Sequence, residues 1–187
     1  APYFADSLEQ ILHTGELAAR FLIRTNLMNG IYSDEVERTN RIGISMTGIH
    51  EFAWKFFKYG FRDLINENKS KDFWNFVSDL RYTIEQAGRN YSKLIGVNEP
   101  HTFTVIKPAG SISKLFNLTE GAHLPQYDQY IRWTQFQNND PLLQKYKEEG
   151  YEVRELKTYN NVSIVGFPMQ PFISTLGMGD KLVLSSE

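Results

Sequence analysis

The chain has 187 residues, of which 41% are hydrophobic and 14% aromatic, enough apolar material for one domain with its own core. With 20 basic and 22 acidic side chains the formal net charge is −2, so the sequence lacks the basic surface that a nucleic-acid backbone requires. Its apolar runs fall well short of the ~20 residues that cross a bilayer. We therefore expect neither nucleic-acid binding nor a membrane span.

The N-terminal part predicts an amphipathic helix of about five turns, followed by a strand and a second helix. Ser7 and Gln10 have the spacing of a capping box, and Asn29-Gly30 is a stop signal. Residues 42–46 have the composition of a short strand, and a glycine turn leads from them into a helix over residues 49–59. Strand, glycine and helix in this order are typical of α/β proteins.

A long helix is predicted over residues 71–95, because apolar side chains recur there at alternating spacings of four and three. The same pattern fits a coiled-coil seam, but it lasts only about three heptads and is followed by Pro100 and a strand. We therefore expect this helix to pack on a sheet. Further along, strands are predicted over residues 130–136 and 162–167, and Asp140-Pro141 begins a helix between them.

The most informative segment joins a strand over residues 102–107 to a small-residue turn, Pro108-Ala109-Gly110, and then to a helix start at Ser111. The first N–H groups of such a helix carry partial positive charge and favour an anion, to which Ser111 and Ser113 would add hydroxyl donors. The alternative is a plain strand-to-helix connection, in which Gly110 relieves strain and Ser111 only caps. Neither a Walker loop nor a GxGxxG fingerprint is present.

The histidines offer little for a metal site. His13, His50, His101 and His123 are spread along the chain without the spacing of metal ligands, and there is no cysteine. We therefore predict no metal-binding residues in this chain, and no catalytic ones. His123 follows the small-residue loop within a turn, where it is either a plain turn residue or a residue that faces a cavity.

The loop carries a resemblance to a known family. The segment from Lys107 to Ser113, with Asn117, Thr119, Gly121 and His123 after it, resembles the phosphate-binding loop of ribonucleotide reductase large subunits. Other segments resemble the same family in the same order along the chain. These are Asn40–Ile49, Tyr130–Trp133, Asp140–Leu142 and Asn160–Pro168. The details are most similar to the adenosylcobalamin-dependent class, and within it to the single-chain ribonucleoside-triphosphate reductases.

The resemblance implies an α/β fold that forms part of a ten-stranded α/β barrel. It also implies that the loop holds the phosphates of a ribonucleotide substrate. The residues concerned are Pro108, Ala109, Gly110, Ser111, Ile112 and Ser113. His123 would line the cavity beside them. Ala109 departs from the family, which usually has serine at this position, so one hydroxyl donor to the phosphate is absent.

Reductases of this family use a cysteine radical and a cysteine pair, and no other side chain offers that redox chemistry. Because the chain has no cysteine, we expect residues 1–187 to be a partial catalytic barrel domain, a fragment of a larger cytoplasmic enzyme. Adenosylcobalamin, a thiol reductant and the remaining reductase segments would serve the complete enzyme, and the cofactor would not bind this segment alone. The alternatives are a non-enzymatic phospho-ligand-binding or assembly module and an ordinary metabolic barrel enzyme with a phosphate site.

Overall fold

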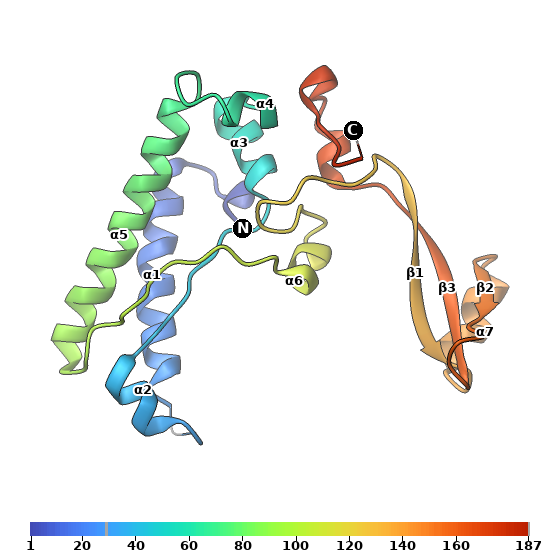
Figure 1. Cartoon of the computed structure of the whole chain (residues 1–187), viewed down its shortest axis with the longest axis horizontal. Coiled ribbons are helices and arrows are strands. Elements are labelled where there is room, and N and C mark those ends of the chain that lie inside the picture. Colours follow the sequence, from blue (N-terminus) through green and yellow to red (C-terminus); the bar gives the residue numbers. More distant parts are fainter. Residues whose placement is uncertain (29, 187) are drawn as a thin grey trace.

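Two long helices that lie side by side and a separate three-stranded sheet are the largest elements of the structure (Figure 1). The computed structural model describes residues 1–28 and 30–186. The helices are α1 (Leu8–Asn26), α2 (Ser33–Thr39), α3 (Ile49–Phe57), α4 (Phe61–Leu64), α5 (Lys71–Ile95), α6 (Gly110–Leu115) and α7 (Pro141–Glu148). The strands are β1 (Tyr130–Gln137), β2 (Glu152–Glu155) and β3 (Val162–Met169). None of the described helices is long and apolar enough to cross a membrane.

The first helix begins as its sequence predicts. The Ser7 hydroxyl accepts a hydrogen bond from the N–H of Gln10 at 3.1 Å, which satisfies one of the free donors at the start of α1. α1 runs parallel to α5 (Figure 1). Gly15 brings the two helices close together, because a Cβ there would lie only 2.9 Å from Cδ1 of Leu80. The stop signal expected at Asn29 lies outside the described residues.

The core lies where α1, α3 and α5 meet, and it confirms the helices predicted over residues 49–59 and 71–95. Phe52 on α3 and Phe73 on α5 are completely buried, and their ring centroids are 5.6 Å apart. Burial of one such aromatic side chain contributes roughly 2 to 3 kcal/mol. The other buried apolar residues of this core include Ile11, Ala19, Ile23, Ile49, Ala53, Leu64, Leu80, Ile84 and Phe103.

The strands predicted over residues 42–46 and 102–107 are wrong as regular strands. The two segments run parallel to each other, but they make one isolated bridge, between Ile44 and Thr104. Backbone hydrogen bonds join them, among them Ile44 N–H to the Phe103 carbonyl at 2.8 Å. A parallel pair is stable only when further strands flank it and both its faces are covered. Among the described residues, each segment has only the other as its partner.

The sheet is antiparallel, with the strand order β1-β3-β2. β1 and β3 confirm the strands predicted over residues 130–136 and 162–167, whereas β2 was not predicted. The ring of Tyr146 on α7 packs at right angles against Phe167 of β3, with centroids 5.1 Å apart. The described residues contain no other sheet, so they form a mixed helix and strand structure and do not show the ten-stranded barrel.

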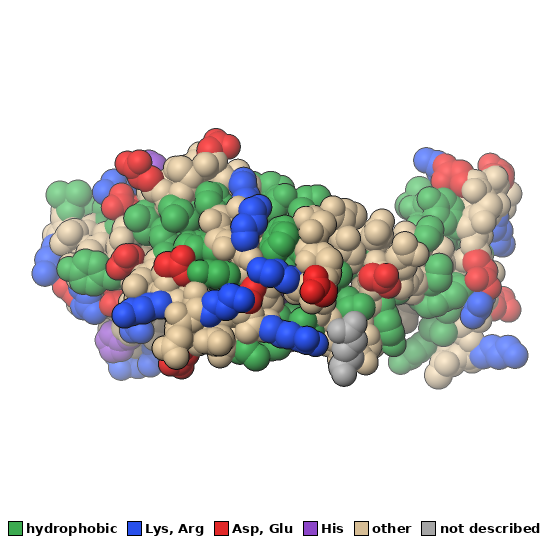
Figure 2. Space-filling view, turned by 90° about the horizontal axis from the view of Figure 1, so that it is seen from above, with side chains coloured by type: hydrophobic (Ala, Val, Ile, Leu, Met, Phe, Trp, Pro, Cys, Tyr) green, Lys and Arg blue, Asp and Glu red, His purple; other side chains and the backbone are tan. Residues whose placement is uncertain are grey.

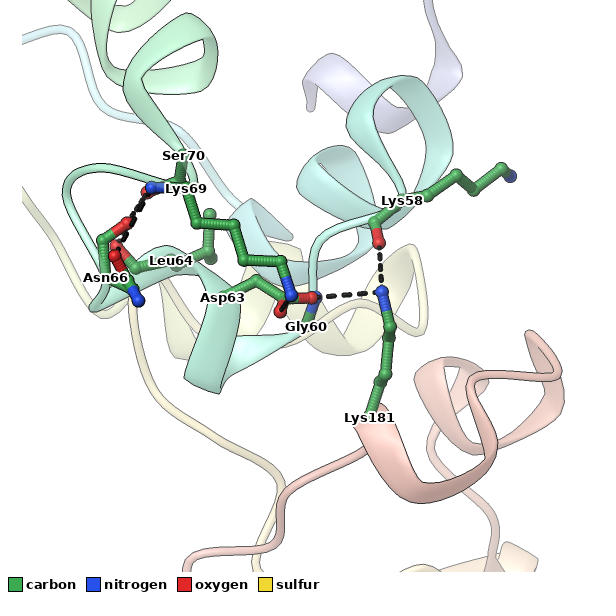
Figure 3. Close-up of polar contacts among 8 residues, drawn as sticks. All are labelled: Lys58, Gly60, Asp63, Leu64, Asn66, Lys69, Ser70 and Lys181. Carbon is green, nitrogen blue, oxygen red and sulfur yellow. Dashed lines mark hydrogen bonds and ion pairs between the residues drawn. The ribbon is translucent and has the colours of Figure 1, made fainter.

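A buried carboxylate ties the C-terminal segment to the corner between α3 and α4 (Figure 3). Asp63, which is 8% exposed, accepts hydrogen bonds from Gly60 N–H at 3.1 Å and from the ammonium groups of Lys69 at 2.5 Å and Lys181 at 3.1 Å. Lys181 also donates to the carbonyl of Lys58 at 3.0 Å. The hydrogen bond from Lys69 is the main cause that lowers the pKa of Asp63 from its usual 3.8 to about 2.

This lowered pKa predicts an acid-dependent loss of stability. The folded state binds the proton of Asp63 more weakly than the unfolded state, so the stabilisation is complete above pH ~4 and is lost as the pH falls towards ~2. We expect the unfolding free energy to fall by up to about 2 kcal/mol across this window. Asp63→Asn should remove this contribution to the dependence in denaturant titrations, and Asp180→Asn, an exposed neighbour, should retain it. An unchanged pH profile in Asp63→Asn would contradict this role.

The surface carries many apolar side chains (Figure 2). Ile31 is 95% exposed, Leu115 78% and Ile106 63%. A groove of about 640 Å³ runs between α1, α5 and the parallel pair, with Ile11 and Val105 among the residues that line it. Open backbone edges and exposed apolar side chains both favour association with another chain.

We therefore expect the 187-residue chain to self-associate when it is made alone, as species larger than a monomer in sedimentation velocity. Ile106→Lys places a charge beside the open edge of the parallel pair and should reduce the association. Addition of a partner chain that covers this edge should raise the melting temperature, because a partner that binds only the folded form stabilises it. A monodisperse monomer with a sharp cooperative melt would show that the chain closes its own core.

Candidate functional site

The small-residue loop ends in the short helix α6. Ala109 precedes the helix in the left-handed conformation, with φ of 51°, and makes no side-chain capping bond. The first helical hydrogen bond runs from Ser113 N–H to the Ala109 carbonyl at 2.9 Å. Gly110, Ser111 and Ile112 are exposed residues, and their N–H groups have no backbone acceptor among the described residues. Three adjacent free donors at a helix start can bind an anion.

Three details of the loop differ from the sequence-based expectation. Ser113 is completely buried, its N–H is engaged in the helix, and its hydroxyl donates to the Gly110 carbonyl at 3.2 Å. It therefore stabilises α6 from inside and is not free to hold a ligand. Ser111 does not cap the helix, because the helix begins one residue earlier; it lies exposed in the first turn. Ala109, rather than Gly110, adopts the left-handed conformation.

The two lysines beside the loop are already engaged with other groups. Lys114 on α6 forms an ion pair with Glu120 at 2.8 Å, so its ammonium is already engaged. The other carboxylate oxygen of Glu120 lies 3.8 Å from the place where a Cβ of Gly110 would be. Lys107 donates to the Gly43 carbonyl at 2.8 Å. An anion at the loop would therefore be held chiefly by backbone donors, close to one acidic side chain.

The structure places His123 in a turn at the rim of a cavity. Its Nδ1 lies 2.9 Å from the carbonyl of Glu120, and its backbone N–H donates to the same carbonyl at 2.8 Å. The cavity has a volume of about 370 Å³, and Lys114, Asn117 and Tyr130 also line it. His123 is thus both a turn residue and a residue beside a cavity, the two alternatives that its sequence position left open. The cavity lies beside the C-terminal end of α6, whereas the free N–H groups are at its beginning.

The beginning of α3 holds the segment that follows α6. Glu51 is completely buried, and its carboxylate accepts hydrogen bonds from the N–H of Thr119 at 2.7 Å and from its hydroxyl at 2.6 Å. Gly48 N–H donates to the Thr119 carbonyl at 3.0 Å. His50 Nε2 lies 3.1 Å from the carbonyl of Ala122, and burial lowers the pKa of this imidazole, which favours its neutral form.

Sequence reasoning did not single out Glu51, and it considered His50 only as a metal ligand. The available signal was an acidic residue within the predominantly apolar helix of residues 49–57, a position at which burial requires partners.

The two ends of the loop also meet. Gly121, with φ of 53°, lies so close to Lys107 that any Cβ would collide with the Lys107 carbonyl oxygen. Among the described residues, no group of three or more His, Asp or Glu side chains could hold a metal ion.

Comparison with known proteins gives one consistent group of relatives. No protein-family model matches the chain. The adenosylcobalamin-dependent ribonucleoside-triphosphate reductase of Lacticaseibacillus paracasei is 28% identical over 170 residues, which cover 82% of this chain and 23% of that protein. The protein of the same description from Lactobacillus leichmannii is 30% identical, and the match covers 82% of this chain and 23% of that protein. The one from Levilactobacillus brevis is also 30% identical, and the match covers 72% of this chain and 20% of that protein.

A solved structure agrees with these relatives. The crystal structure of a B-12 dependent (class II) ribonucleotide reductase superimposes with a TM-score of 0.74 at 27% identity, and the match covers 90% of this chain and 26% of that one. The chain thus spans about a fifth to a quarter of the length of the proteins that it matches.

Proposed function

We propose that this chain, a homologue of the adenosylcobalamin-dependent ribonucleoside-triphosphate reductases, forms one segment of an enzyme that reduces ribonucleotides to deoxyribonucleotides. Residues 1–187 would belong to the catalytic domain of that larger enzyme. The observation that carries the proposal is the loop before α6, where free N–H groups lie at a helix start within a chain that matches these reductases over most of its length.

The proposed role of the loop is to hold the substrate's phosphates. The N–H groups of Gly110, Ser111 and Ile112 would donate to phosphate oxygens, and the exposed Ser111 hydroxyl would add a fourth donor. Pro108 and Ala109 would shape the turn without contributing a side-chain donor. Fixing the phosphates restricts the ribose to one orientation, and such positioning can lower a reaction barrier by several kcal/mol.

The reacting groups would come from the rest of the enzyme. The chain has no cysteine, so the thiols of the reaction, and the reductant that regenerates them, would act on other segments. Adenosylcobalamin, which supplies radical chemistry when bound, would likewise be held by other segments, and we assign no residue of this chain to it. The second candidate, a phospho-ligand-binding or assembly module without the chemistry, is favoured by this same lack of thiols.

The pure 187-residue chain should therefore show no ribonucleotide turnover. The assay supplies a ribonucleoside triphosphate, adenosylcobalamin and a dithiol, and measures the deoxyribonucleotide formed. Activity should appear only when the remaining reductase segments are added. Turnover by the chain alone would contradict the proposal, and failure of every reconstitution would favour the non-enzymatic module.

Ala109→Ser should strengthen phosphate binding at the loop. The variant adds a hydroxyl donor beside the free N–H groups, and one additional hydrogen bond is worth roughly a two- to tenfold gain in affinity. Isothermal titration calorimetry with inorganic tripolyphosphate would measure it. Ala109→Gly is the matched control, because it also accepts the left-handed conformation but has no hydroxyl. Equal affinity in the parent chain and Ala109→Ser would count against a phosphate at this loop.

A further inference from the structure

The carboxylate of Glu51 is buried without a cationic partner. It has no exposed surface, and no described Lys, Arg or His forms an ion pair with it. Its hydrogen bonds from the N–H and the hydroxyl of Thr119 are short, at 2.7 and 2.6 Å. Glu51 is also the third residue of α3, where the helix dipole favours negative charge. Burial of a carboxylate costs free energy unless hydrogen bonds compensate for the lost water. Both hydrogen bonds that Glu51 accepts come from Thr119, so Thr119 is held firmly against α3.

Thr119 is connected rigidly to α6. The Leu118 N–H donates to the Ser113 carbonyl at 2.9 Å, and the Asn117 N–H donates to the Lys114 carbonyl at 3.2 Å. Asn117 is left-handed, with φ of 53°, so these bonds form the usual left-handed closure of a helix end. The six-residue helix and Thr119 therefore move together.

α6 packs on the core through one buried side chain of its own, that of Ser113. It has no side-chain cap at its start, and its residues Ile112, Lys114 and Leu115 lie exposed. A helix this short is not stable by itself, so its position depends on its anchors. Two kinds of hydrogen bond join it, through Thr119, to the start of α3, which belongs to the core: the backbone bond from Gly48 N–H to the Thr119 carbonyl, and the two bonds that Glu51 accepts.

We propose that Glu51 is a positioning residue for the phosphate loop: its carboxylate, through Thr119, sets where the N–H groups of Gly110 to Ile112 lie. It does not contact the ligand. The inference rests on the proposed function in so far as the loop binds phosphate. The placement of α6 by Glu51 can be measured without any ligand.

The test compares Glu51→Gln and Thr119→Val with the parent chain. Glu51→Gln sets an amide N–H₂ against a donor of Thr119, and Thr119→Val removes one hydrogen bond and keeps the shape of the side chain. We expect amide hydrogen exchange, followed by mass spectrometry, to rise in residues 108–119 and to stay unchanged in α1 and α5. Affinity for inorganic tripolyphosphate should fall roughly three- to tenfold in both variants.

Two controls separate positioning from charge and from general stability. Glu67→Gln removes the same charge from an exposed site, and it should leave exchange unchanged and bind the anion equally or slightly better. Glu51→Gln is expected to change affinity in the opposite direction. Thr119→Ser keeps both donors and should behave as the parent chain.

Three results would overturn the proposal. They are unchanged exchange of residues 108–119 in Glu51→Gln, exchange that rises equally in α1 and α5, and tripolyphosphate affinity in Glu51→Gln that matches Glu67→Gln. If Glu51→Gln does not fold, Thr119→Val decides by the same measurements. If the parent chain does not bind tripolyphosphate, the phosphate role fails, and ligand-free exchange still decides whether Glu51 positions α6.

Discussion

The position of the candidate site depends on a close contact between α5 and the segment that leads into the loop. At Gly88, any Cβ would collide with the ring of Phe103, so the ring lies directly against the helix backbone. Phe103 is 5% exposed, and the guanidinium of Arg89 lies 5.3 Å from its ring centroid. Because only four residues separate Phe103 from Pro108, the packing of α5 largely determines where the loop begins.

The far end of the loop is held by a different helix. The start of α3 bonds to Thr119 through Glu51 and lies near the carbonyl of Ala122 through His50. Gly121 and the Lys107 carbonyl then bring both ends of the loop together. The loop is thus anchored by α5 on one side and by α3 on the other, and both helices share one aromatic core. This arrangement lets an exposed six-residue helix keep a defined position.

Local signals predicted most elements of the fold, and the exceptions depend on distant partners. Ser7 with Gln10, and Asp140 with Pro141, form helix starts whose contacts lie within four residues, so the sequence alone indicates them. β1 and β3 form because each has a complete antiparallel partner. Residues 42–46 and 102–107 have the same strand-like composition, but a parallel pair requires neighbours that the described residues do not provide, so only one bridge forms.

The candidate site also has features that local sequence predicts and features that depend on distant partners. A small-residue turn with proline predicts that a helix starts near residue 110, since proline and glycine end a strand locally. Which side chains face inward is decided by tertiary packing, and so the burial of Ser113 could not be foreseen. Glu51 and Thr119 are 68 residues apart, and His50 and Ala122 are 72 apart. Local sequence thus determines that α6 exists, whereas these long-range hydrogen bonds determine which way its free N–H groups face.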